Sequence, residues 1–378
     1  DTTFTFNGLV SASPVKLKAN VVSRSANSKT FYLTSNGAAI GSISLAGVIL
    51  SNTTGVYANQ KSGTFTIGVP NENVNVRVTY NKTESSDEGF LDYLILNVRR
   101  QLQMTDNALF FRDITHSGSA EIVQYNVANC SQQTEIWDIT DRFHIRKIPA
   151  QLNGTVLAFS DSTLFLKEYV ALNPSASFPK PEINGSETDL GPVPNQNLHA
   201  AGPSQMLIVT HPLFLAAADS LAAFHREHDQ MSVLVATTEQ IYNEFSSGAR
   251  DVSAIRDFAR LIYGRATQDQ DRLRYLLLVG DGSYNNISME QGNSNFILTY
   301  QSESSLNAST SYVSDDFFGF MDDDEGGSEF MEVYMLDVGV GRLPVKTATE
   351  AMAVYRKIKN YNTGKNRYDW RNNILFVG

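Results

Sequence analysis

The densest group of side chains that could do chemistry is an acidic segment near residue 320. Two carboxylates precede the sequence FFGFM and three follow it directly, with Glu325 next and Glu329 nearby: Asp315, Asp316, Asp322, Asp323 and Asp324. Ca²⁺ takes about 6–8 oxygen ligands in flexible geometry, which such a cluster with neighbouring glycines can supply. The spacing differs from that of an EF-hand loop. We therefore expect either a structural calcium site formed by these five aspartates or a solvated acidic turn.

A histidine, an aspartate and a serine follow strand-like segments in the second half of the chain. His211 follows MLIVT, whereas Asp281 and Ser283 follow RYLLLVG. The carboxyl ends of parallel strands meet at one edge of a sheet, where such residues could supply a nucleophile, a base and an orienting acid. However, GDGSYN lacks the G-x-S-x-G pattern that exposes a nucleophilic serine. We expect a tight turn at Asp281 and a backbone-bonded loop histidine at His211, not a serine hydrolase.

Cys130 is the single cysteine, so it is the only thiol nucleophile that these residues could offer, and no disulfide can form within the chain. It lies in VANCSQQTEIWDIT, without a predicted helix N-terminus or a basic neighbour that would lower its pKa. We expect a structural thiol. His225 and His228 differ in spacing from the H-E-x-x-H zinc motif, and an exposed helix surface explains them better.

The composition restricts the classes of protein to which the chain can belong. Its 378 residues predict two or three domains, and a hydrophobic content of 42% excludes a disordered protein. With 30 Lys+Arg and 40 Asp+Glu, the charge of −10 repels phosphate, so we expect no nucleic-acid partner. Charged residues make up only 19%, which favours an exported β-rich protein. The chain opens with Asp-Thr-Thr, as expected for a mature product or an excised piece.

Residues 1–172 show the alternation that is typical of antiparallel strands. In VNVRVTY, Val74, Val76, Val78 and Tyr80 are predicted to face one way and the residues between them the other. Similar segments, TFTIGV, DYLILNVRR, IVQYNV, EIWDIT and TLFLKEYVAL, are separated by turn residues. Many short strands at this spacing predict one or two β-sandwiches.

Residues 173–204 are predicted to form a linker, because six of the eleven prolines lie there: Pro174, Pro179, Pro181, Pro192, Pro194 and Pro203. Residues 205–378 then alternate apolar strands with amphipathic helices. The predicted strands are MLIVT, SVLVA, RYLLLVGD, VYMLDVGVGRLPV and the beginning of NNILFVG. The predicted helices run from Pro212 to about Gln230, over DVSAIRDFARLIYG with Asp251 as N-cap, and over TATEAMAVYRKIKNY. Such alternation predicts a parallel sheet covered on both faces.

Several segments of this second half, in their order along the chain, resemble the gingipain-type cysteine peptidases, and within them the PorU-type sortases of the type IX secretion system. The most specific blocks are LLLVGD, SDDFFG and VGRLP, and the resemblance extends over about residues 204–378. In the first half, LDYLILNVRR and EIWDIT are similar to the β-rich region that precedes the peptidase unit in PorU-type proteins. The implied fold is an N-terminal antiparallel β-sandwich-like region followed by the first half of a caspase-like parallel α/β sheet domain.

The resemblance implies a cysteine endopeptidase with a His–Cys dyad, in which a thiolate attacks the peptide carbonyl and backbone donors hold the oxyanion. Both dyad residues of the family follow strands beyond the one that NNILFVG begins. No position here matches them, so no catalytic or cofactor-binding residue is assigned and the chain alone is expected to be inactive. The chemistry requires no cofactor, and the family's calcium binding supports a structural calcium at the acidic segment. The expected chain is thus the N-terminal part of the enzyme, truncated at the start of the next strand.

The resemblance also implies partners and a location. The parent enzyme would remove C-terminal sorting domains from secreted cargo at the bacterial outer membrane and cell surface. It would contact outer-membrane components of type IX secretion and attachment, and the remainder of its own catalytic domain. The alternative is a non-catalytic surface β-sandwich module for binding or assembly, and a third hypothesis is a carbohydrate-active exported protein.

Overall fold

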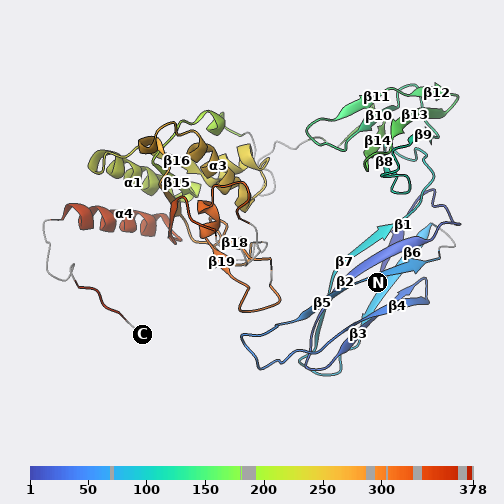
Figure 1. Ribbon diagram of the computed structural model, residues 1–378, viewed down its shortest axis with the longest axis horizontal. Helices are drawn as coiled ribbons and strands as arrows, with labels where there is room; N and C mark the ends of the chain where they lie inside the picture. The colour runs from blue at the N-terminus through green and yellow to red at the C-terminus, as the bar shows by residue number, and fades with distance from the viewer. Residues whose placement is uncertain are drawn as a thin grey trace. The chain divides into compact units, whose positions relative to one another are not determined.

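The computed structural model describes residues 1–68, 72–178, 180, 193–286, 294–303, 305–326, 334–364 and 373–376. The chain divides into two compact units, Asp1–Pro192 and Val193–Gly378. In Figure 1 the first unit, coloured blue to green, consists of strands, and the second, coloured yellow to red, combines helices with strands. The boundary between the units falls inside the proline-rich segment, of which residues 179 and 181–192 lie outside the described residues.

The first part of unit 1 is a sandwich of two antiparallel sheets, with strand orders β1-β6-β3-β4 and β5-β2-β7. Alternating residues of both sheets meet in one core around Leu17, Val21, Phe31 and Leu33. Val74 and Val76 are buried in it, as the alternation predicts. The strands are β1 (Thr2–Thr5), β2 (Val15–Arg24), β3 (Lys29–Ser35), β4 (Ala38–Leu45), β5 (Asn59–Ile67), β6 (Asn73–Tyr80) and β7 (Glu88–Asn97).

The second part of unit 1 has two smaller antiparallel sheets, with orders β11-β10-β14-β8 and β12-β13-β9. Its core is rich in aromatic rings: those of Tyr125 and Phe159 stack at a centroid distance of 5.0 Å, and Tyr169 packs against both. The strands are β8 (Ala108–Arg112), β9 (Ile122–Val127), β10 (Glu135–Asp138), β11 (Arg146–Ile148), β12 (Gln151–Asn153), β13 (Val156–Ser162) and β14 (Glu168–Leu172).

Unit 2 contains a parallel sheet of order β16-β15-β17-β20. Its strands are β15 (Met206–Thr210), β16 (Val233–Thr237), β17 (Tyr275–Val279) and β20 (Gly339–Leu343). All five residues of β15 are buried, because this strand has helices on both faces. A short antiparallel ladder joins β18 (Tyr300–Gln301) to β19 (Val313–Ser314).

The helices of unit 2 cover both faces of the sheet. They are α1 (Leu215–His228), α2 (Thr238–Phe245), α3 (Val252–Gly264) and α4 (Ala348–Thr363), with short 3₁₀ turns η1 (Leu198–Ala200), η2 (Pro212–Phe214), η3 (Asp269–Asp271) and η4 (Asp316–Gly319). Helices α1 and α4 pack on the face of Ile208, and α2 and α3 on that of Leu207. Asp251 caps α3 as predicted, since its side chain accepts a bond from the backbone N–H of Ser253.

The predicted fold class is confirmed, with three differences in the elements. Helix α2 was not predicted, and only the second half of TLFLKEYVAL forms a strand, because β14 begins at Glu168. The predicted buried strand in NNILFVG is wrong for the part that is described: residues 373–376 form no strand, and Ile374 is 80% exposed. A strand requires a ladder partner, and no described strand pairs with this segment. Among the described residues, no helix combines the length and apolarity needed to cross a bilayer.

Candidate functional site at the carboxyl edge of the parallel sheet

The carboxyl ends of three parallel strands of unit 2 are joined by backbone hydrogen bonds. The N–H of His211, after β15, donates to the carbonyl of Val279 at 3.3 Å. After β17, the N–H of Gly280 donates to Leu343 at 3.0 Å and that of Asp281 to Val345 at 3.0 Å. The segments that follow β15, β17 and β20 therefore meet at one edge, where open parallel sheets place their ligands.

Asp281 connects two of these segments through its side chain. Its Oδ2 accepts a hydrogen bond from the Ser294 hydroxyl at 2.5 Å and lies 3.3 Å from Nζ of Lys346. Burial would raise the pKa of Asp281, but the bonds from Ser294 and Lys346 outweigh it and hold the pKa below its usual range. The carboxylate is therefore charged at neutral pH and fixes the following loop to the end of β20.

Gly280 allows this close assembly. Its φ is +148°, which residues with a side chain rarely adopt, and an added Cβ would lie 3.1 Å from Cβ of Phe296. The carbonyl of Asp281 then accepts bonds from the N–H groups of Phe296 and Ile297 at 3.0 and 3.1 Å. These bonds bring residues 294–297 back to the edge of the sheet, whereas residues 281–283 form no regular turn, so the predicted tight turn is not confirmed.

His211 is the N-cap residue of η2 at this edge of the sheet. Its Nδ1 accepts a hydrogen bond from the N–H of Leu213 at 3.2 Å, which caps η2 and leaves the ring proton on Nε2. The ring packs edge-on against Phe296 at a centroid distance of 5.0 Å. Burial lowers the pKa of His211, so the imidazole is neutral at physiological pH. The prediction of a backbone-bonded loop histidine is confirmed.

His211, Asp281 and Ser283 do not form a catalytic triad. Asp281 bonds Ser294 and Lys346, and the Ser283 hydroxyl accepts a bond from the N–H of Asn285 at 3.1 Å. Within the described ranges, no serine or cysteine side chain is hydrogen-bonded to an imidazole ring. These residues therefore organise the edge, and a nucleophile paired with its base is not assembled from them.

Arg342, in β20, connects several segments of the edge through the hydrogen bonds of its side chain. Its guanidinium binds both oxygens of Asp315 at 2.7 Å, and its Nη1 donates to the carbonyls of Gly280 and Ile297 at 3.0 Å each. The two side chains are only 12% and 27% exposed. A bidentate bond of this kind fixes the position of both groups, so Arg342 holds the end of β17, the returning loop and the segment before η4 together.

Two arginines of α3 hold the rest of the acidic segment. Arg256 donates to the carbonyl of Phe320 at 2.7 Å and to that of Asp322 at 3.1 Å. Arg260 donates to the carbonyl of Met321 at 2.9 Å and pairs with the Asp323 carboxylate. The segment is therefore attached to the helix mainly through its backbone.

The five aspartates predicted to bind calcium have different surroundings. Asp315 is bound by Arg342 and Asp323 by Arg260, whereas Asp316, Asp322 and Asp324 are exposed. The part of the chain that the structure describes contains no group of three or more Asp, Glu, His or Cys residues arranged to hold a metal ion. Glu329 lies outside the described residues. The calcium site stays a prediction.

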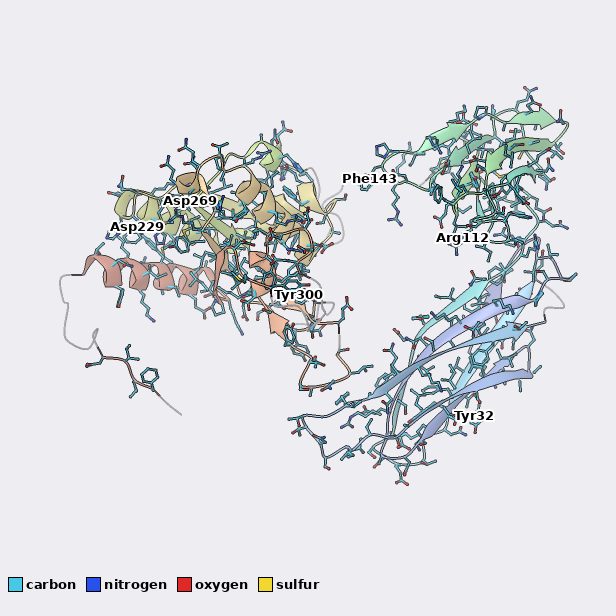
Figure 2. All side chains as sticks on the ribbon, in the orientation of Figure 1. Tyr32, Arg112, Phe143, Asp229, Asp269 and Tyr300 are labelled. Atoms are coloured by element: carbon cyan, nitrogen blue, oxygen red, sulfur yellow. The ribbon has the colours of Figure 1, made fainter. Side chains whose placement is uncertain are left out.

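Cys130 lies in unit 1 and has the properties of a structural thiol. Its side chain is buried, and Sγ donates to the carbonyl of Val127 at 3.3 Å. Burial raises the pKa of the Cys130 thiol, which disfavours the thiolate that a nucleophile requires. His225 and His228 both bond the Asp229 carboxylate, at 2.6 and 2.7 Å, at the end of α1, where Figure 2 labels Asp229. His228 is exposed as predicted, whereas His225 is half-buried.

The residues that connect the edge were not predicted from the sequence: Arg342, Lys346, Ser294, Arg256 and Arg260. One signal was available for Arg342, because a charged residue inside a short strand between apolar neighbours requires a buried partner. The other residues lie in polar loops or on a helix surface, where their type alone indicates nothing.

Comparison with known proteins identifies what this architecture resembles. Residues 199–378 match the model of peptidase family C25, the gingipain family, which confirms the resemblance for this part of the chain. The fold matches the crystal structure of dimeric latent PorU from Porphyromonas gingivalis with a TM-score of 0.81 and 22% sequence identity. The match covers 100% of this chain but 36% of the PorU chain. No curated protein matches the chain.

Proposed function

We propose that this chain is the N-terminal part of a PorU-like sortase, a cysteine endopeptidase that removes C-terminal sorting domains from proteins of the type IX secretion system. The observation that supports this most directly is the match of residues 199–378 to peptidase family C25, since these residues also form the parallel sheet and its joined carboxyl edge. The enzyme would act at the outer membrane and cell surface, together with secretion and attachment components.

In this proposal the two units have different tasks. Unit 2 supplies a rigid half of the catalytic sheet, in which Arg342 and Asp281 hold the loops at the edge. The remainder of the catalytic domain supplies the histidine and the cysteine nucleophile, with no cofactor required for the chemistry. Unit 1 steers the cargo or the partners toward the peptidase. Cys130 takes no part, because its thiol is buried and its pKa is raised.

The proposal is tested on the whole protein with a secreted cargo that ends in a sorting domain. Mass spectrometry of the cargo from wild-type cells should show a new C-terminus, and deletion of the gene should leave the sorting domain attached. Replacement of the catalytic cysteine in the remainder of the protein should have the same effect as the deletion, whereas Cys130→Ser should leave processing unchanged. A cargo that is still trimmed in the deletion strain would exclude the sortase role.

A second measurement separates the peptidase hypothesis from the non-catalytic binding module. A peptidyl probe with a thiol-reactive group should label the whole protein once, at the catalytic cysteine, and should leave the isolated 378-residue chain unlabelled until it is unfolded. Failure to label the native whole protein, combined with unchanged cargo binding, would instead support the binding module.

We keep a structural calcium ion at the acidic segment as part of the proposal. The expected result is a higher melting temperature of unit 2 when calcium is added, which Asp322→Ala/Asp324→Ala abolishes because it removes hard oxygen ligands. Asp269→Ala/Asp271→Ala, an acidic pair elsewhere in unit 2, is the matched control and should keep the response. An unchanged melting temperature in the wild type would reject the calcium site.

A further inference from the structure

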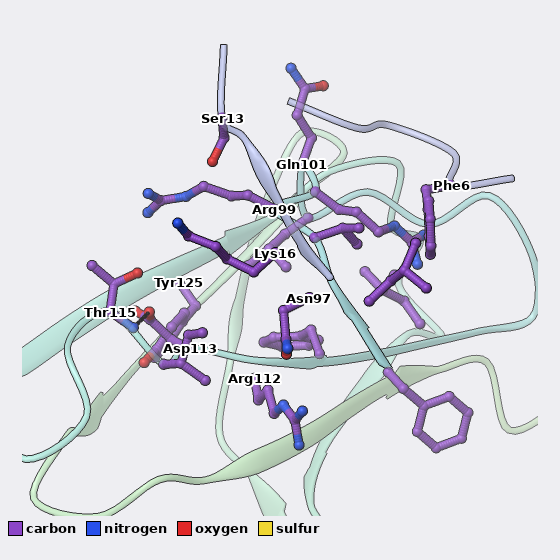
Figure 3. Close-up of a pocket in the computed structure, with 18 of the residues that line it drawn as sticks. Phe6, Ser13, Lys16, Asn97, Arg99, Gln101, Arg112, Asp113, Thr115 and Tyr125 are labelled. Carbon is purple, nitrogen blue, oxygen red and sulfur yellow. Dashed lines mark hydrogen bonds between the residues drawn. The ribbon is translucent and has the colours of Figure 1, made fainter. Parts of the chain in front are cut away.

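Unit 1 contains a cavity of about 500 Å³ that the peptidase proposal does not use. Two continuous stretches form most of its lining, residues 96–102 and residues 109–115, and the remaining lining residues are Phe6, Ser13, Pro14, Lys16 and Tyr125. Figure 3 shows side chains from both stretches around the opening. Ligand sites usually have volumes of about 300–1,000 Å³, so the cavity is large enough to take several residues of a peptide or a compact small molecule.

The wall formed by residues 96–102 is fixed by hydrogen bonds in both directions. The N–H of Val10 donates to the carbonyl of Arg99 at 2.9 Å, and the N–H of Gln101 donates to Gly8 at 2.7 Å. On the other side, the N–H of Ala128 donates to Leu102 at 2.8 Å. The cavity is therefore preformed, and a ligand would not have to order this segment on binding.

The lining is basic although the whole chain carries a net charge of −10. Four cationic side chains and one carboxylate line the cavity. The cations are Lys16, Arg99, Arg100 and Arg112, and the carboxylate is that of Asp113. His116 already bonds the Asp113 carboxylate at 2.6 Å. Arg100 donates to the carbonyl of Asn7 at 2.9 Å and is used structurally.

Arg99 and Lys16 are the cations that remain available to an anion. Among the described residues, no hydrogen bond or ion pair of the Arg99 side chain is found, and Lys16 donates only to the Thr66 hydroxyl at 2.7 Å. Figure 3 shows both side chains extending toward the same side of the cavity. A guanidinium with no partner binds carboxylates well, because its planar fork matches their two oxygens.

The second wall favours a peptide as the ligand. Strand β8 is the last strand of its sheet and pairs only with β14 among the described strands, so its outer edge has unpaired backbone groups. Residues 109–115 of this strand and the following turn line the cavity, with the aromatic rings of Phe110 and Phe111. An extended peptide can add to such an edge through its backbone while apolar side chains contact the rings.

We propose that this cavity is a binding site for an extended acidic peptide, which adds along the outer edge of β8 and places carboxylates on Arg99 and Lys16. Arg112, labelled in Figure 2, would contribute when its exposed pair with Glu168 opens, because an exposed pair of this kind is weak. The site does not depend on the peptidase function, and it would be present in a binding module as well.

The test uses the 378-residue chain and a fluorescein-labelled ten-residue peptide that alternates glutamate with valine. Fluorescence anisotropy should show saturable binding, and Arg99→Gln/Lys16→Gln should weaken it at least about tenfold, since two charge-assisted contacts are lost. The matched control, Lys82→Gln/Arg142→Gln, removes two exposed cations of unit 1 away from the cavity and should bind as the wild type does. Equal binding by the two double variants would overturn the proposal. Circular dichroism confirms that both are folded.

Three further probes separate an acidic peptide from other occupants. A peptide with glutamine in place of glutamate should bind much more weakly, because it lacks the carboxylates. A peptide with alternate backbone nitrogens methylated should also bind much more weakly, because it lacks the N–H donors to β8. Inorganic phosphate that displaces the peptide at equal concentration would overturn the proposal in favour of a small-anion site. Self-association of the chain that Arg99→Gln/Lys16→Gln abolishes, without binding of free peptide, would assign the cavity to a second copy and also overturn it.

Discussion

Arg342 is a charged residue within a four-stranded parallel sheet, and its surroundings explain how it is tolerated there. The guanidinium is bonded to both oxygens of Asp315 and to the carbonyls of Gly280, Ile297 and Leu298. A buried charge is stable only when it is paired and its remaining donors are satisfied. Arg342 meets both conditions, so removing either partner should leave an uncompensated charge.

We predict that Arg342→Met lowers the free energy of unfolding of unit 2 by about 3 kcal/mol, since breaking a buried pair from one side is strongly destabilising. Urea unfolding followed by circular dichroism measures the change. Arg342→Met/Asp315→Leu, which removes both charges, should recover part of the loss. Arg274→Met is the control, because its pair with Asp269 is exposed and is worth about 0–1 kcal/mol. Equal losses in Arg342→Met and Arg274→Met would contradict the structural importance of the pair.

Single residues could be predicted from the sequence where their neighbours along the chain determine their surroundings. His211 before a proline and Cys130 in a β-rich region without basic neighbours are of this kind, and both have the predicted structural properties. The partners of Arg342 could not be predicted, because they lie 27 residues away at Asp315 and 62 residues away at Gly280. Only the folded sheet brings these groups together.

Most strands and helices follow from the hydrophobic pattern, and those that do not have physical reasons. Helix α2 has eight residues and was missed, although its capping box, Thr237 with Gln240, is a recognisable start signal. The segment TLFLKEYVAL is apolar on both sides of Lys167, so its pattern alone does not indicate that the strand begins only at Glu168. Residues 373–376 are as apolar as a buried strand, but apolarity cannot supply a ladder partner.

Asp87 joins the ends of four strands in the first sandwich. It directly precedes β7, and its carboxylate bonds Ser25 after β2, Lys29 at the start of β3 and Thr83 after β6, at 2.5–3.2 Å. Strands β2 and β7 belong to one sheet and β3 and β6 to the other. One buried carboxylate therefore closes this end of the sandwich across both sheets.

The Asp87 cluster predicts acid sensitivity of unit 1. The bond from Lys29 holds the pKa of Asp87 well below its usual range, with further help from Ser25, Thr83 and Glu84 and against the effect of burial. Because the pKa is lower in the folded state, the stabilisation is fully present above about pH 4, near the unfolded value, and is lost as the pH falls toward the folded pKa. The urea midpoint of unit 1 should therefore decrease below about pH 4.

Asp87→Asn should reduce this pH dependence, because an amide cannot titrate, and it should also lower stability at neutral pH by leaving Lys29 buried without its counter-ion. Urea midpoints between about pH 3 and 7 measure both effects. Asp106→Asn, a change at an exposed aspartate of the same unit, should keep the wild-type slope. Parallel pH profiles of the wild type and Asp87→Asn would show that the cluster does not control acid unfolding.

At the scale of the whole molecule, the chain is two compact units with separate hydrophobic cores. Each of the four clusters of buried hydrophobic residues found in the described structure lies within one unit, two around the β-sheets of unit 1 and two on the faces of the parallel sheet of unit 2. Burial of apolar surface is the main source of cooperativity in unfolding. A unit with its own core can therefore unfold without the other.

We predict two calorimetric transitions for the 378-residue chain, which the substitutions above assign. Arg342→Met should lower only the transition of unit 2, and Asp87→Asn only that of unit 1, because each residue stabilises contacts inside its own unit. Residues 1–192 and 193–378 produced separately should each reproduce one transition, within a few degrees of its position in the intact chain. A single transition that both substitutions lower equally would instead mean that the units fold as one cooperative body.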